Sequence, residues 1–585
     1  MPAAPPVVLT AFSGEQPRVI PRLMPETAAQ SARDVRLDDG GLTPMRSSAV
    51  AVTGIPLSWK SIYNYLGTWI GWDNVVNAAP GPIAEDRLYY TGDGVPKMRI
   101  GSTIYPLAVP FPLDPLTAAI TVAGAGDIVS RQYAYTYVTD FGEESEPSAI
   151  SNAIDWKPTA TVTLSGFLAA PAGRAISLQR IYRTQTGSTG TGLYFIAERP
   201  ASNANFVDNL AVTAIAEPCP SISYNAPPDD LEGLIALPNG MMAAFVGKKL
   251  YFSEQYRPHA WPEKYILTMD YKIVGLGAMN VSIVVATEGQ PYLVSGNLPE
   301  NMTSQKIEQN LPCINKRSIV DLGYAIAYGS NEGIVVARAD GSIGIASANI
   351  FDRDGWFELN PDTMIAAQLN GRYVSFYDRL DPQGTRERGA LLLDLANPNF
   401  LARTATYARA VMYDIGKSAL FYAPFDAGEV RQMDAPSASR LRLYWKSKEF
   451  VLPYPENYGA FIVDTVDDLV PLDEDAYQAQ VAVAQAVNAV LIAAGSIGGD
   501  IAATPIGVYS VDGDSLTEMP RRPGETMTVG IYADKKLVAG VGVVNRAVRL
   551  PSGFRARTWE VDIYTDQRIY RMTMAKTMDD LKRQP

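Results

Sequence analysis

Few residues in this sequence are of a type able to do acid–base or metal chemistry. The 585-residue chain has one histidine, His259 in the segment RPHAWP, and two cysteines, Cys219 and Cys313. A single histidine excludes a His-rich metal site and any arrangement that needs a second histidine. Because His259 stands between proline and aromatic residues, we interpret it as a packed structural residue rather than a general base. The cysteines form no CxxC pattern, so we expect two buried thiols rather than a disulfide.

Carboxylates gather at three places along the chain. Glu143, Glu144 and Glu146 lie in the turn DFGEESEPS. A general acid–base pair needs carboxylates that face each other across a cleft with separated pKa values, and we expect these three to be solvated in one turn instead. The segments 352–355 (DRDG) and 512–514 (DGD) offer oxygens for calcium, but neither completes an EF-hand loop, so both are predicted to be turns.

Three further motifs invite a functional interpretation. Gly124-Ala125-Gly126 and the stretch GSTGTG at 187–192 are glycine-rich. A phosphate-binding loop follows a strand and opens a helix, which neither stretch does, so we predict ordinary loops. Asp354-Gly355-Trp356 is similar to the aspartate-box turn of propeller glycosidases, but it lacks the Ser and Thr and occurs once. The sequence therefore predicts no catalytic, cofactor-binding or metal-binding residue, and no enzyme.

The composition favours a folded chain of short strands and turns. Hydrophobic residues are 47% and charged residues 19%, which excludes a disordered chain, and Gly 47, Pro 42 and Tyr 31 are typical of strands joined by tight loops. The net charge of −12 opposes nucleic-acid binding, which depends on Lys and Arg neutralising phosphates. Residues 1–12 carry no signal-peptide pattern. Residues 481–499 are uncharged and Ala-rich but contain polar residues and glycines, so we predict a tip helix rather than a membrane span.

The first 226 residues divide into two predicted regions. Residues 1–126 are predicted to be an extended, proline-punctuated segment followed by strands, with a short helix over 26–35 and a tight turn at Asp39-Gly40. Residues 127–226 are predicted to form an immunoglobulin- or fibronectin-like β-sandwich, because about 100 residues of short strands alternate with regular turns. In its strand RQYAYTYVT, the tyrosines at 133, 135 and 137 share one face.

Residues 227–435 contain a repeated strand–turn–strand pattern. Each copy has a glycine in its turn, and these glycines recur every 38 to 45 residues, at Gly247, Gly289, Gly333, Gly371 and Gly416. One hairpin in about 40–45 residues is the period of a four-stranded propeller blade. We therefore predict β-propeller blades, with an ordinary large antiparallel β domain as the alternative.

Residues 436–585 are predicted to be a C-terminal β domain with strand pairs at 441–465 and 526–575. Between them we predict a helical insert at about 473–499, whose helix begins at Asp473 and stops before Gly495. An insert between two strands of one β domain projects away from that domain. The fold class predicted for the whole chain is mainly β and multidomain, with propeller, sandwich and C-terminal β domain.

Six segments carry a resemblance to a known family: 133–148 (YAYTYVTDFGEESEPS), 237–265 (LPNGMMAAFVGKKLYFSEQYRPHAWPEKY) and 286–296 (ATEGQPYLVSG), with weaker ones at 316–336, 445–453 and 549–563. None of them is a catalytic signature. Together they resemble the tail nozzle, or tail tubular protein B, family of short-tailed bacteriophages. The Ala-rich insert near 475–500 departs from that family.

The resemblance implies a structural protein of the virion, assembled in the host cytoplasm. It implies a homohexameric tail nozzle that binds the head-to-tail adaptor ring and carries tail fibres or spikes. Genomic DNA would pass through the lumen without sequence-specific binding, and an acidic wall suits this because like charge prevents phosphate capture. The distal tip would contact the host envelope. A separate hypothesis rests on the helical insert at 473–499, which departs from the family: six copies of its uncharged stretch around an axis would narrow or gate the outlet. A receptor-binding adhesin and, less favoured, a propeller glycosidase remain alternatives.

Overall fold

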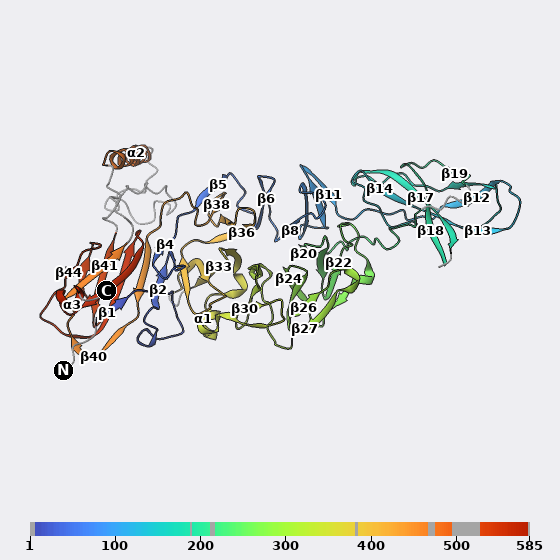
Figure 1. Cartoon of the computed structure of the whole chain (residues 1–585). Helices are drawn as coiled ribbons and strands as arrows, with labels where there is room; N and C mark the ends of the chain where they lie inside the picture. Colours follow the sequence, from blue (N-terminus) through green and yellow to red (C-terminus); the bar gives the residue numbers. More distant parts are fainter. Residues whose placement is uncertain are drawn as a thin grey trace.

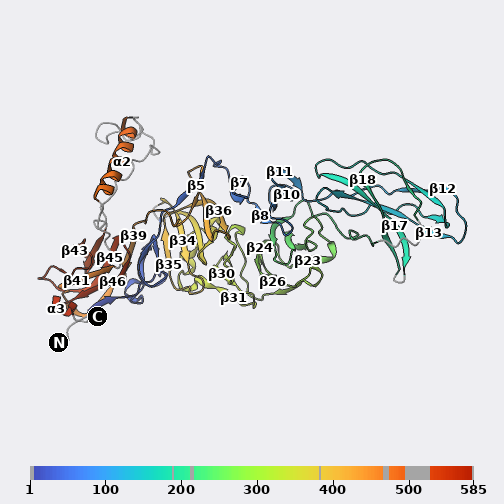
Figure 2. The ribbon, with the colours of Figure 1, turned by 45° about the horizontal axis from the view of Figure 1, so that its top comes forward.

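The computed structural model describes residues 6–187, 190–210, 217–380, 384–465, 474–493 and 527–582. The chain is mainly β, as predicted, and its sheets form three bodies in a row. Figure 1 shows a two-sheet body at one end, a group of small sheets in the middle and a narrow module at the other end. The rotated view in Figure 2 keeps this order, so the molecule is elongated.

The middle body consists of antiparallel groups of strands that follow one another along the chain. Most are separate four-stranded sheets, and β32–β35 are the end of a ten-stranded sheet. The five predicted hairpins lie within them, and each predicted glycine stands at its turn, which confirms that part of the sequence analysis. The sheets contain β20 (Glu232–Ala236), β21 (Met242–Val246), β22 (Lys249–Phe252) and β23 (Leu267–Thr268); β24 (Ile273–Met279), β25 (Ser282–Thr287), β26 (Tyr292–Ser295) and β27 (Thr303–Lys306); β28 (Val320–Asp321), β29 (Ile326–Ser330), β30 (Gly333–Ala337) and β31 (Ile343–Ile345); β32 (Ile365–Leu369), β33 (Arg372–Leu380), β34 (Arg386–Leu393) and β35 (Leu401–Thr404); and β36 (Ala408–Asp414), β37 (Ala419–Pro424) and β38 (Glu429–Gln432).

Strands from the N-terminal region complete this body. β5 (Ala49–Thr53) pairs with β38 as the fourth strand of the last sheet, although the two are far apart in sequence. The hairpin β6 (Ser61–Tyr65) and β7 (Thr68–Trp72) follows. The next sheet contains β8 (Asn77–Pro80), β9 (Arg87–Thr91), β10 (Lys97–Ile100) and β11 (Thr103–Pro106).

The sheets of the middle body close into a ring. In order, β8, β20, β24, β28, β32, β36 and β6 each contact the next. The circle is completed where the Trp72 ring lies 5.1 Å from the Tyr90 ring and the Tyr65 hydroxyl donates to the Asp86 carbonyl at 2.6 Å. We call this body the ring. Its members come from residues 49–106 and 232–432, so the narrow module is inserted between β11 and β20.

The narrow module at the far end is built around tyrosines, and we call it the tyrosine-rich module. One sheet contains β12 (Thr117–Val122), β16 (Thr161–Ser165) and β19 (Phe206–Asp208); the other contains β14 (Tyr133–Thr139), β17 (Ile176–Gly187) and β18 (Gly190–Pro200); β13 (Val129–Arg131) pairs with β15 (Ile154–Trp156). As predicted, Tyr133, Tyr135 and Tyr137 share one core. The predicted boundary at residue 127 is wrong, because β12 pairs with β16 and Ala118 lies in this core.

The C-terminal body consists of two sheets with one shared apolar core. It contains β39 (Leu443–Ser447), β40 (Phe450–Glu456), β42 (Thr528–Ala533), β43 (Lys536–Val541) and β45 (Ala556–Thr565) in the first sheet, and β1 (Val7–Leu9), β41 (Ala460–Thr465), β44 (Val548–Arg549) and β46 (Ile569–Ala575) in the second. The strand pairs predicted at 441–465 and 526–575 are therefore present. The first sheet continues into the ring, because β2 (Ala29–Arg33) pairs with both β39 and β35.

Two predicted helices have opposite outcomes. The helix predicted over 26–35 is wrong: this segment forms β2 and β3 (Val35–Arg36), because the large sheet supplies partners on both sides. β3 pairs with β4 (Thr43–Pro44) around the predicted turn at Asp39-Gly40. The helical insert is confirmed as α2 (Glu474–Ala493), which lies apart from the sheets in both views (Figures 1 and 2). Asp473 and Gly495, its predicted ends, lie outside the described residues.

Candidate functional site

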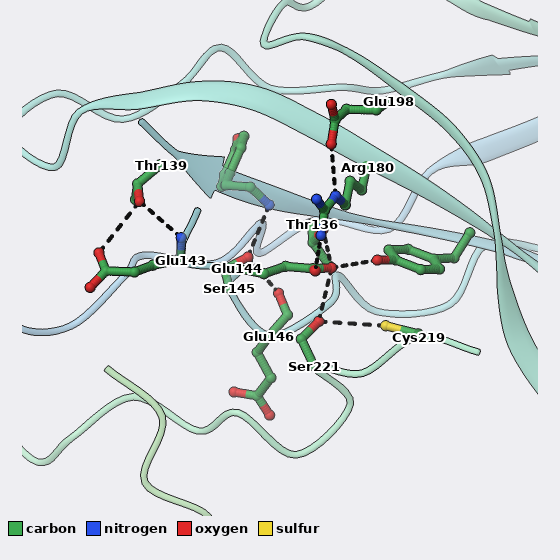
Figure 3. A network of polar contacts seen from close by, with 12 residues as sticks. Thr136, Thr139, Glu143, Glu144, Ser145, Glu146, Arg180, Glu198, Cys219 and Ser221 are labelled. Carbon is green, nitrogen blue, oxygen red and sulfur yellow. Dashed lines mark hydrogen bonds and ion pairs between the residues drawn. The ribbon is translucent and has the colours of Figure 1, made fainter. Parts of the chain in front are cut away.

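A buried network of polar side chains lies where the tyrosine-rich module meets the ring, and we call it the joint (Figure 3). Its centre is the Glu144 carboxylate, which is 2% exposed. Arg180 donates to it at 2.7 Å and the Tyr182 hydroxyl at 2.5 Å. The hydroxyls of Thr136 and Ser221 add hydrogen bonds of 2.9 and 3.2 Å. The charge is therefore compensated by one cation and three hydroxyl donors from separate segments.

The neighbouring Glu143 carboxylate faces the ring side of the joint. It is 2.6 Å from Arg174, and both side chains are almost fully buried. Arg174 also donates to the carbonyl of Leu107, which follows β11 of the ring. This arginine therefore fixes the module to the ring through one ion pair and one backbone contact.

His259 brings a loop of the ring into the same joint. Its Nε2 lies 3.2 Å from the Glu144 carbonyl, and its ring packs edge-on against Tyr224. The imidazole is 3% exposed. Burial, reinforced by the positive charges of Arg174 and Arg257, lowers the pKa of His259 to about 3, so the ring is neutral and Nε2 carries the proton it donates. The structure places His259 as a packed, hydrogen-bonded residue, in agreement with the sequence analysis.

The expectation of a solvated turn at Glu143, Glu144 and Glu146 is wrong. The first two are buried, and Glu146 is half-buried and accepts a 2.8 Å hydrogen bond from Asn225. Burial is the main cause that raises the pKa of Glu146. Because Glu143 and Glu144 are closed to solvent and held by arginines, a substrate cannot reach them. The arrangement joins two bodies and offers no open acid–base pair.

A signal for this burial is present in the sequence, in the serines at every third position from 145 to 151. The segment runs beside β14, and its serines use both backbone and side chain to pair with the tyrosine strand. Ser145, Ser148 and Ser151 pair in this way with Tyr137, Tyr135 and Tyr133, at 2.8 to 3.2 Å. An extended segment with three residues per turn explains the spacing.

A second buried ion cluster lies inside the tyrosine-rich module. Asp208 is 1% exposed and receives hydrogen bonds from Arg183 at 3.0 Å and from the Tyr133 hydroxyl at 2.8 Å. Arg131 is 3.8 Å from the same carboxylate and stacks on the Trp156 ring, 3.3 Å from its centroid. Burial, together with the Asp208 charge, raises the pKa of Tyr133. This cluster locks β19 to β14 and β17 and is closed to solvent.

Side chains cross the middle of the ring. Arg317, beside β28, donates to the backbone carbonyls of Lys60 and Arg409 at 2.9 and 2.5 Å, and so links β28 to the segments at β6 and β36. Lys316 reaches Glu232 of β20 at 3.2 Å. Burial lowers the pKa of Arg317 to about 10. These contacts join sheets on different sides of the ring across its middle.

A cavity of about 560 Å³ lies against this crossing. Three carboxylates line it, and all three residues are exposed. Glu232 is bound to Lys316. A glycosidase acid needs a carboxyl that burial keeps protonated, and solvated or ion-paired carboxylates do not provide one. The carboxylates are Asp230, Glu232 and Glu288.

The role of Arg317 can be tested by replacing it. Arg317→Met is expected to lower the free energy of unfolding of the ring by about 1–3 kcal/mol, because two hydrogen bonds from a charged donor, to the carbonyls of Lys60 and Arg409, are lost. Urea denaturation followed by circular dichroism measures the change. Arg338→Met, at an exposed arginine that follows β30 of the same sheet, is the matched control and should leave the urea midpoint in place. Equal midpoints for the two variants would contradict a role for Arg317 in holding the ring closed.

The remaining candidate motifs are structural. Asp352 caps α1 (Arg353–Phe357) by accepting from the Gly355 amide at 2.8 Å, and Trp356 is buried. Gly124–Gly126 connects β12 to β13, and the 187–192 stretch is the β17–β18 hairpin, where residues 188–189 lie outside the described residues. The 512–514 turn also lies outside them. Cys219 and Cys313 are free and buried, as expected. Within the described ranges no group of acidic, Cys or His residues has the arrangement of a metal site.

Comparisons with known proteins do not identify the chain. No protein family matches the sequence, and no curated protein matches it. Among solved structures, the Pan2 WD40 domain of Neurospora crassa is similar over 62% of this chain and 90% of its own, at 9% identity and a TM-score of 0.26. A likeness this weak carries no argument. Among the described helices, none is both long and apolar enough to cross a membrane.

Proposed function

We propose that the protein is a structural component of a phage tail, the nozzle of a short-tailed virion. In this proposal the ring is a β-propeller and the tyrosine-rich module an inserted β-sandwich. Six copies surround a lumen through which genomic DNA passes. They bind the adaptor ring, carry fibres or spikes, and contact the host envelope at the distal tip.

The observation that carries the proposal is the rigid connection of three β bodies in a row. The C-terminal body and the ring share one continuous sheet through β2 and β35, and the buried joint fixes the tyrosine-rich module to the ring. A wall that must withstand passage of a duplex needs protomers without free hinges. Domains joined by small polar interfaces are expected to move relative to one another. A sheet that continues from one body into the next, and ion pairs buried between bodies, oppose such motion.

In this proposal the lumen lies between copies of the chain. The major groove of a B-form duplex alone is about 12 Å wide, and Arg317 and Lys316 form contacts across the middle of the ring. DNA therefore passes between copies and not through one chain. The net charge of −12 supports a wall that does not capture phosphate.

Electron microscopy of the purified protein, alone and mixed with its adaptor, tests this proposal. The expected particles are six-fold rings or short tubes with one central channel wide enough for a duplex. A matched sample with Arg338→Met, an exposed substitution, should give the same particles. Strictly monomeric protein in both samples would overturn the proposal.

A further inference from the structure

A groove of about 490 Å³ lies on the ring between the β34–β35 and β36–β38 segments. None of its lining residues belongs to the joint. One wall is aromatic: the Tyr407 and Phe425 rings lie 6.0 Å apart, and Phe425 is 48% exposed. The opposite side is polar. The lining residues used below are Arg388, Tyr407, Phe425, Asp426, Glu429 and Arg431.

Arg388 is held in place on the aromatic wall. Its guanidinium carbon is 3.8 Å from the centre of the Phe425 ring and 5.3 Å from that of Tyr407. Its Nε donates to Asp378 at 3.1 Å. No hydrogen bond from its two terminal nitrogens is made within the described residues. A stacked guanidinium fixed at Nε therefore presents a pair of parallel donors, the geometry that recognises two adjacent oxygens.

The charges of the groove select among ligands. Arg388 and Arg431 are balanced by Asp426 and Glu429, and Glu429 is paired with Arg431. A balanced groove does not concentrate a polyanion, because nucleic-acid binding depends on excess positive charge. The groove offers a flat apolar wall, carboxylate acceptors and a paired donor. A sugar fits these features, because its pyranose has an apolar C–H face and carries hydroxyl groups along its edge.

We propose that this groove binds an oligosaccharide. One pyranose stacks on the face of the half-exposed Phe425 ring that Arg388 leaves open, and two adjacent oxygens of a neighbouring sugar unit are bound by Arg388. Glu429 and Asp426 accept hydrogen bonds from further hydroxyl groups. The proposal is independent of the conduit function, since it concerns one protomer and needs no lumen.

The test uses the full-length protein and an array of neutral and acidic oligosaccharides from bacterial capsules and O-polysaccharides. The best binder is then titrated by calorimetry. Phe425→Ala is expected to weaken binding about tenfold, because the stacking surface is lost. Arg388→Lys, which keeps the charge but loses the paired donors, is expected to weaken it by a similar factor. Tyr454→Ala removes an exposed aromatic residue of β40 and is the matched control, with unchanged binding.

Each other outcome overturns the proposal. Absence of binding to every saccharide at about millimolar protein and ligand is one such outcome. Equal affinity of wild type and Phe425→Ala is another, because it places the saccharide elsewhere. A ten-nucleotide oligothymidine bound more tightly than any saccharide, with that binding lost in Phe425→Ala, would assign the groove to nucleic acid instead.

Discussion

Between pH 6.5 and about pH 4.5, the free energy of unfolding of the joint is expected to fall by about 1.4 kcal/mol for each unit of pH. The cause is His259, whose pKa falls from 6.5 to about 3 on burial. Below pH 6.5 the unfolded chain binds a proton at this residue and the folded chain does not. The stability from the neutral imidazole is therefore complete above pH 6.5 and is lost progressively as the pH falls.

Because the chain has a single histidine, one substitution removes all histidine titration from the pH profile. Some carboxyl groups, among them Glu146 and Asp434, have a raised pKa and act in the opposite direction at low pH. The variant His259→Gln retains a neutral donor for the Glu144 carbonyl and cannot be protonated. Subtracting its pH profile from that of the wild type isolates the histidine.

The measurement is urea denaturation from pH 7 to pH 4.5, with hydrogen exchange of peptides from the joint as a local readout. The wild-type profile should be steeper than that of His259→Gln across this window. Parallel profiles would show that His259 takes up its proton equally in the folded and unfolded chains. The Glu143 carboxylate, 4.0 Å from Nδ1, would then outweigh burial and the charges of Arg174 and Arg257.

The replacement Asp208→Ala is expected to lower the free energy of unfolding of the tyrosine-rich module by about 3–5 kcal/mol. The carboxylate is the shared partner of Arg183, Arg131 and the Tyr133 hydroxyl. Its removal leaves two buried guanidinium groups without their anion. Removing one partner of a buried ion cluster lowers the free energy of unfolding strongly, because the remaining charges stay desolvated and unpaired. Replacing the whole cluster by apolar residues would lower it less.

Thermal and urea unfolding by circular dichroism, with hydrogen exchange of peptides from residues 129–156 as a module-specific signal, measures this change. Asp208→Asn keeps the shape and one acceptor, so its midpoint should lie between those of wild type and Asp208→Ala. The control is Asp270→Ala, which breaks the exposed 2.8 Å pair with Lys306 and should leave the midpoint in place. Similar midpoints for Asp208→Ala and Asp270→Ala would contradict the buried cluster as a source of stability.

Local patterns in the sequence were sufficient for the secondary structure of most segments. Strand alternation predicts the tyrosine face of β14, and the glycine spacing predicts the five hairpins of the ring. Both are short-range properties, because a strand has a period of two and a tight turn needs a residue with positive φ, as Gly247 and Gly371 have. The helix α2 was predictable for the same reason.

The errors occur where a distant segment decides the outcome. Residues 26–35 look helical by themselves, yet Gln30 donates to the carbonyl of Ser447 and β2 is enclosed by β35 and β39. Glu143 and Glu144 look solvated in a turn rich in acidic residues. Arg174, Arg180 and a loop of the ring bury them. No local pattern contains these partners, which are 31 or more residues away.

By itself the sequence determined that the chain is mainly β, where its hairpins turn, and that it has one histidine and two thiols. The tertiary structure alone decided that strands from residues 49–106 complete the ring begun at residue 232, and that the ring axis is crossed by Arg317. It also decided that the acidic turn and the histidine meet in one buried joint. The physical reason is that backbone periodicity acts over a few residues, whereas sheet closure and charge burial depend on contacts between residues far apart in the chain.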